Sequence, residues 1–172
     1  MDTVNIKQWM DSYIDSQSGM SETEKRQAKN FTTPSDFVGI LTKLEKNGQG
    51  HLRTIYVRLR AMSKVIKIPC LSIDEVNTAA AFYEYLLYKS EIENKVARAP
   101  YVERKATKVG WIKTVADLVK TKTESKGFKY LVDANRLDVS LEYFALMNPK
   151  IFDDDVVDSA HTKLNKYGKY YK

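Results

Sequence analysis

Few residues of this sequence have the type and spacing that metal-dependent or nucleophilic chemistry requires. The chain has two histidines, His51 and His161, and one cysteine, Cys70. These three residues do not form the histidine–cysteine spacing of a zinc site. Cys70 follows Pro69 in an apolar stretch, which favours a buried, unreactive thiol over a nucleophile paired with a histidine. The sequence therefore predicts neither a metal site nor a cysteine nucleophile.

Other polar patterns have simple structural explanations. The acidic run 153–155, followed by Asp158, suits the N-terminus of a helix, where the dipole favours negative charge, better than a divalent-cation site. The glycine pair at 48 and 50 lacks the lysine and hydroxyl residue, or the third glycine, of a phosphate-binding loop. Glu-Asn-Lys at 93–95 ends a predicted helix, whereas the nuclease motif it resembles needs a strand. We predict no catalytic residue, no metal, no cofactor and no enzymatic activity.

The excess positive charge is confined to two segments. The formal net charge is +6, from 28 lysines and arginines against 22 acids. Residues 51–70 carry five basic side chains and no acid, and residues 95–129 carry ten basic and three acidic ones. Residues 71–94, with one basic and five acidic side chains, are net acidic. Clustered lysines and arginines neutralise phosphates and release their counterions, so this pattern favours nucleic-acid binding.

The leading functional prediction is a non-enzymatic accessory protein that binds DNA or RNA through segments 51–70 and 95–129. A basic, tyrosine-rich C-terminal tail at about 163–172 interleaves amines with aromatic rings, which suits stacking on single-stranded nucleic acid. The predicted nucleic-acid contacts are Arg53, Arg58, Arg60, Lys64, Lys67, Arg104, Lys105, Lys108, Lys113, Tyr167, Lys169, Tyr170 and Tyr171.

The same charges are compatible with other partners. A basic face is often only the solvated side of an amphipathic helix, and an acidic protein surface or an anionic membrane surface would attract the same lysines. The alternative function is therefore a protein-interaction or assembly module, such as an inhibitor, adaptor or structural subunit. In such a module the acidic segment 71–94 and the basic segment 95–129 would pair between copies. A viral or phage accessory protein suits the chain's size under either function.

Composition also bounds the class of protein. One cysteine excludes an intramolecular disulfide, which favours a reducing, cytoplasmic compartment. No apolar run approaches the roughly 20 residues of a membrane-spanning helix, and residues 1–7 lack the apolar stretch of a signal peptide. With 43% hydrophobic residues, a chain of 172 residues can bury one ordinary core, so we expect a single domain over 1–172.

Helix signals recur along the whole chain and predict an all-α, compact domain of about six to eight helices. Gly110 is a candidate break inside one of them. Apolar residues at a spacing of three and four, together with capping residues, place these helices at about 3–17, 21–30, 33–47, 72–97, 102–123, 140–147 and 153–167.

Residues 52–68 are ambiguous. Leu52, Tyr56 and Leu59 fit the face of a helix, but apolar and polar residues also alternate here as in a strand. We favour a helix because the neighbouring segments are helical. The core predicted from all these stripes consists of Trp9, Phe37, Tyr83, Leu87, Trp111, Val115 and Phe144.

Overall fold

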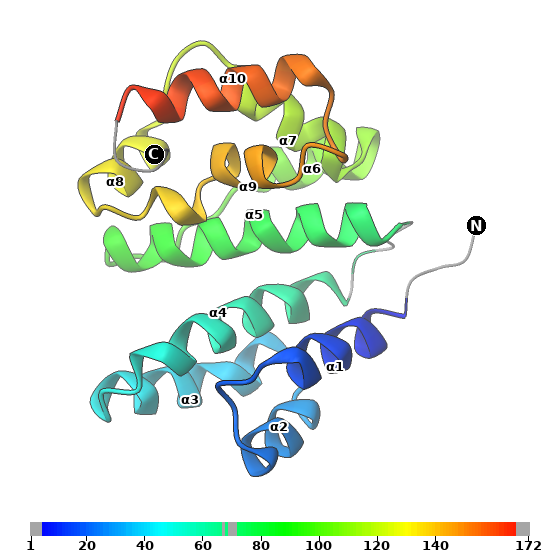
Figure 1. Cartoon of the computed structure of the whole chain (residues 1–172), viewed down its shortest axis with the longest axis vertical. Helices are drawn as coiled ribbons and strands as arrows, with labels where there is room; N and C mark the ends of the chain where they lie inside the picture. Colours follow the sequence, from blue (N-terminus) through cyan, green and yellow to red (C-terminus); the bar gives the residue numbers. More distant parts are fainter. Residues whose placement is uncertain (1–4, 67, 69–71, 168–172) are drawn as a thin grey trace. The chain divides into compact units, whose positions relative to one another are not determined.

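The computed structural model describes residues 5–66, 68 and 72–167 of the chain (Figure 1). Every regular element in these residues is a helix, with no strand, so the predicted all-α class is confirmed. The predicted number of helices is wrong, because the described residues form ten α-helices and one short 3₁₀ helix. One predicted helix is divided at Gly110, and another helix, at 126–133, was not predicted.

The chain divides into two compact units, residues 1–84 and residues 85–172. The boundary falls within helix α5 (Ile73–Ile92). The single domain over 1–172 stays a prediction.

Four helices and the start of α5 form the first unit: α1 (Ile6–Ser16), α2 (Glu22–Lys29), α3 (Pro34–Lys46) and α4 (Gly50–Val65). Their starts follow the capping signals of the sequence. Ser21 and Glu24 form the predicted reciprocal capping box of α2, and α3 begins at Pro34. Asp36 accepts the backbone N–H groups of Thr32 and Thr33 at 2.9 and 2.7 Å, and these bonds lower the pKa of its carboxyl.

Helix α4 resolves the ambiguity of residues 52–68 in favour of the helix. It packs against α3 and α1, and its buried residues lie all around the axis. Phe37 of α3 is fully buried, with its ring centre 6.4 Å from that of Tyr56 on α4. Burial on nearly every side explains why the apolar residues also fitted a strand pattern.

The end of α5 and the remaining helices form the second unit: α6 (Pro100–Val109), α7 (Trp111–Lys120), α8 (Lys126–Asp133), the 3₁₀ helix η1 (Leu137–Val139), α9 (Leu141–Met147) and α10 (Asp154–Asn165). Helix α10 lies beside α9 and also packs on α7, while α7 packs on α6 and α9 (Figure 1). Val115, Val119 and Ala160 are completely buried between these helices.

Most of the predicted core is buried. Phe37, Tyr83, Leu87, Trp111 and Val115 are buried. The two remaining aromatic residues of that set are only half-buried. Within the described residues, no helix is both long enough and apolar enough to cross a membrane.

Candidate nucleic-acid interface

The basic residues of α4 make contacts within the first unit. Arg58 donates through Nη1 to Oε2 of Glu84 at 2.9 Å, and both side chains are more than four-fifths buried. The ammonium of Lys64 lies 5.3 Å from the centre of the Tyr83 ring, a cation–π contact. Arg53 and Arg60 are half-buried on the same helix. Much of the charge predicted for segment 51–70 is therefore engaged by the protein itself.

Some of the predicted C-terminal contacts lie outside the described residues. Lys67, in segment 51–70, and Cys70 also lie outside them. Of the tail residues, Tyr167 is described, while Lys169, Tyr170 and Tyr171 are not. The hydroxyl of Tyr167 donates to Oε2 of Glu124 at 2.6 Å. Its ring meets Phe128 edge-on, with 5.8 Å between ring centres. This ring therefore packs against Phe128 of α8, and its hydroxyl is engaged by Glu124.

Lys105 of α6 and Lys113 of α7 meet at one carboxylate. Each ammonium lies 2.7 Å from an oxygen of Asp117. Hydrogen bonds from Lys105 and then from Lys113 lower the pKa of Asp117 to about 2. Two cations share one anion here, so this cluster keeps one positive charge while it holds α6 against α7.

The outer face of α6 carries the remaining two predicted contacts of this segment. Arg104 and Lys108 are exposed, and neither forms an ion pair within residues 5–66, 68 and 72–167. The Nε of Arg104 donates to the carbonyl oxygen of Pro100 at 3.3 Å, and the N–H groups of its two terminal nitrogens are further donors that a phosphate could accept. These two cations are the predicted contacts that stand most open to a polyanion.

Tyr101 shares that face and is a residue that the sequence reasoning missed. It precedes Arg104 by three positions and Lys108 by seven, a spacing that puts all three on one side of a helix. Its side chain is 71% exposed, which is unusual for a tyrosine. The spacing was visible in the sequence, but an aromatic residue at helical spacing more often belongs to a core. We call Tyr101, Arg104 and Lys108 the α6 face.

The net charge of the second unit, which contains the α6 face, is more positive than that of the first unit. Residues 85–172 include seventeen basic and twelve acidic side chains, a balance of +5. Residues 1–84 include eleven basic and ten acidic ones, a balance of +1. Nearly all of the excess charge therefore belongs to the unit that contains the α6 face, and this charge would attract a polyanion over a distance of about 10 Å.

Acids and histidines of the described residues form no group of three or more that could hold a metal ion. The acidic run 153–155 opens α10: Asp153 is its N-cap residue, and the next two acids lie in the first turn. Asp155 also pairs with Lys120 at 2.9 Å, which lowers the pKa of its carboxyl. These acids therefore serve the helix start and a bridge between α10 and α7.

Comparisons with known proteins identify no relative of this chain, so the functional argument rests on the α6 face. The chain matches no protein-family model, no curated protein and no solved structure.

Proposed function

We propose that this protein binds single-stranded nucleic acid through the α6 face. The observation that carries the proposal is the 71% exposure of Tyr101 on the same side of one helix as two exposed cations without acidic partners. Proteins that bind single strands combine aromatic rings, on which bases stack, with lysines and arginines that contact the phosphates. The α6 face contains both parts within about two turns of helix.

The chemistry of each side chain determines its role in binding. Arg104 offers a planar fork that can contact one phosphate through two nitrogens, and Lys108 offers a mobile point charge one turn further on. Tyr101 offers a ring whose stacking on a base depends little on which base it is. We therefore expect binding that responds strongly to salt and weakly to base sequence.

The basic residues of α4 are less suited to this task. Arg58 would have to leave Glu84, and Lys64 would have to leave the Tyr83 ring, before either could contact a phosphate. Each exchange would cost part of the energy that the new contact supplies. The second unit is therefore the part of the chain that we assign to nucleic-acid binding.

Loss of the Tyr101 ring tests the proposal. Tyr101→Ala should weaken the binding of a fluorescent single-stranded oligonucleotide by roughly tenfold, because stacking contributes about 1–3 kcal/mol per base. Tyr101→Phe keeps the ring and should bind like the wild-type protein. Tyr130→Ala is the matched control, because Tyr130 is a solvent-exposed tyrosine on α8, outside the α6 face. Fluorescence anisotropy at 50 and 200 mM salt measures all four proteins.

Two outcomes would contradict the proposal. One is the absence of oligonucleotide binding by the wild-type protein at low salt. The other is equal oligonucleotide affinity of Tyr101→Ala and Tyr130→Ala, which would show that the Tyr101 ring does not stack on a base. If the wild-type protein binds an acidic polypeptide but no oligonucleotide, the interaction-module function replaces this one.

A further inference from the structure

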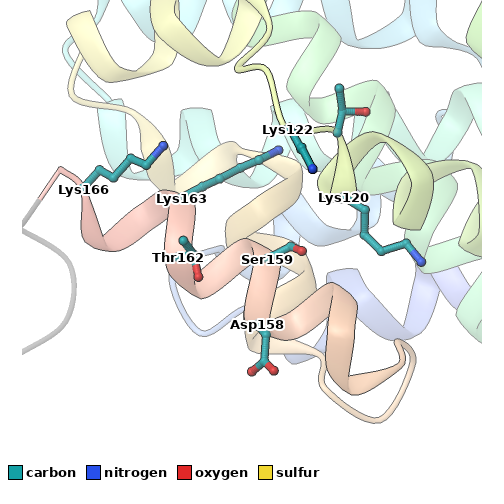
Figure 2. Close-up of a pocket in the computed structure, with 8 residues that line it drawn as sticks. Lys120, Lys122, Asp158, Ser159, Thr162, Lys163 and Lys166 are labelled. Atoms are coloured by element: carbon teal, nitrogen blue, oxygen red, sulfur yellow. The ribbon is translucent and has the colours of Figure 1, made fainter.

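A hollow of about 320 Å³ lies on the second unit, where the end of α7 and the residues after it face α10. Four lysines line it: Lys120 and Lys122 from the α7 side, Lys163 in α10, and Lys166 directly after α10. Figure 2 shows Lys163 extending toward Lys122, whereas the carboxylate of Asp158 points away from them. The lining therefore has four cations and one acid.

Hydroxyl groups complete the lining of this hollow. Thr121 follows α7, and Ser159 and Thr162 lie on the same face of α10 as Lys163 and Lys166. Hydroxyls and ammonium groups both donate hydrogen bonds to oxygen acceptors. A phosphate group presents three or four such oxygens and a negative charge. The hollow therefore offers the donors and the charge that a phosphate group needs.

Three of the lysines also contact carboxylates that do not line the hollow. Lys120 pairs with Asp155 at 2.9 Å, Lys163 with Glu142 at 3.3 Å, and Lys166 with Glu124 at 3.4 Å. An ammonium group has three N–H donors, so one carboxylate contact leaves the others for a further acceptor. The last two distances are long for charge-assisted hydrogen bonds, whose usual range is about 2.7–2.9 Å.

Lys122 differs from the other three lysines. It is exposed, and among the described residues it has no carboxylate partner. An incoming anion would therefore meet Lys122 without displacing an existing contact. Lys163, in contrast, is 7% exposed and lies at the buried side of the hollow, where a contact is screened less by solvent. One lysine is placed to capture an anion and the other to hold it.

We propose that this hollow binds a phosphate group. The volume lies at the lower end of the range of about 300–1,000 Å³ for small-molecule sites, so the group belongs to a free phosphate or pyrophosphate ion or to the phosphorylated end of a larger molecule. The site is separate from the α6 face and does not depend on nucleic-acid binding there.

Calorimetric titration of the full chain with sodium phosphate, pyrophosphate and a 5′-phosphorylated dinucleotide tests the site, with sodium chloride at equal ionic strength as the reference. At least one phosphate compound should bind, and the tightest of the three identifies the source of the group. Lys122→Ala should weaken this binding by about tenfold, since a hydrogen bond to a charged group is removed. Lys150→Ala removes the same charge from an exposed lysine outside both the hollow and the α6 face, and should leave phosphate binding unchanged.

A second variant tests the role of Lys163 without removing a lysine. Glu142→Gln deletes the carboxylate that competes for the Lys163 ammonium, so phosphate should bind more tightly than to the wild-type protein. The proposal is overturned if phosphate compounds bind no better than chloride, or if Lys122→Ala and Lys150→Ala have equal effects. Tyr101→Ala separates the two proposals, because it should impair oligonucleotide binding and leave the binding of inorganic phosphate, which has no base to stack, intact.

Discussion

Replacing Lys163 with methionine is expected to lower the free energy of unfolding by about 3 kcal/mol at pH 7. Lys163 and Glu142 are 7% and 8% exposed, and Nζ of the lysine lies 3.3 Å from Oε1 of the glutamate. Methionine fills a similar space but leaves the Glu142 carboxylate buried without its cation. Removing one partner of a buried ion pair costs about 3–5 kcal/mol of stability. We expect a loss at the lower end of this range, because Glu142 can take up a proton and so lose its buried charge.

The double variant Lys163→Met with Glu142→Leu should recover most of this loss. Apolar residues of similar size often replace a buried ion pair without a net cost, because both desolvation penalties disappear with the charges. Urea unfolding followed by circular dichroism gives the four free energies of this double-mutant cycle. A single variant that loses less than about 1 kcal/mol, or a double variant no more stable than the single one, would contradict the description of this pair.

The pH dependence of the same pair follows from the burial of Glu142. Burial raises the pKa of its carboxyl above the ordinary value of 4.5, although Lys163 acts in the opposite direction. The folded protein then holds a proton that the unfolded chain has already lost. The contribution of Glu142 to stability is therefore full below pH 4.5 and decreases as the pH rises through its folded pKa. The stability of the wild-type protein relative to Glu142→Gln should fall over that range.

Replacing Gly110 with alanine should destabilise the protein by about 2 kcal/mol. Gly110 separates α6 from α7 with φ 86° and ψ 161°, a backbone conformation that residues with a Cβ rarely adopt. Its N–H donates to the carbonyl oxygen of Ala106 at 2.9 Å, and its own carbonyl oxygen accepts from the hydroxyl of Thr114 at 2.8 Å. Because both sides of the glycine are fixed, the backbone cannot rotate to relieve an added methyl group.

Gly39→Ala is the matched control for Gly110→Ala. Gly39 lies inside α3 with a helical backbone, and a Cβ added there would meet no atom within 4 Å. Alanine is preferred to glycine in a helix interior, so this variant should be more stable by about 0.5–1 kcal/mol. Thermal unfolding of both variants should give shifts of opposite sign, and equal shifts would show that the conformation at Gly110 is not the cause.

Local sequence signals predicted most helices of this fold, because periodicity and capping are local properties. They failed at α8, where only eight residues form the helix and Gly127 stands at its second position. A Cβ at Gly127 would collide with the hydroxyl of Tyr85, so the glycine allows close packing against α5 and does not mark a loop. Ser125 caps this helix by accepting the N–H of Phe128 at 3.0 Å. The signal was present, but the glycine obscured it.

The candidate site was harder to predict than the fold, because it depends on partners far apart in the sequence. Arg58 and Glu84 are separated by 26 positions, so no local pattern shows that this arginine is engaged. Charge counting located the basic segment 95–129, but it could not separate Lys105, which is bound to Asp117, from the exposed Lys108. The charge distribution thus identified the basic segment 95–129. Only tertiary contacts distinguish its exposed cations from its paired ones.

The salt dependence of oligonucleotide binding tests the role of the α6 face most directly. We expect the logarithm of the association constant for a single strand to fall linearly with the logarithm of salt concentration. Replacing both Arg104 and Lys108 with alanine should reduce that slope by about 1.4, since each phosphate contact on a single strand contributes about 0.7. The double variant Lys105→Ala with Lys113→Ala removes the same charge from the Asp117 cluster and should change the slope less. An unchanged slope in the Arg104 and Lys108 double variant would contradict the proposed contact between α6 and phosphate.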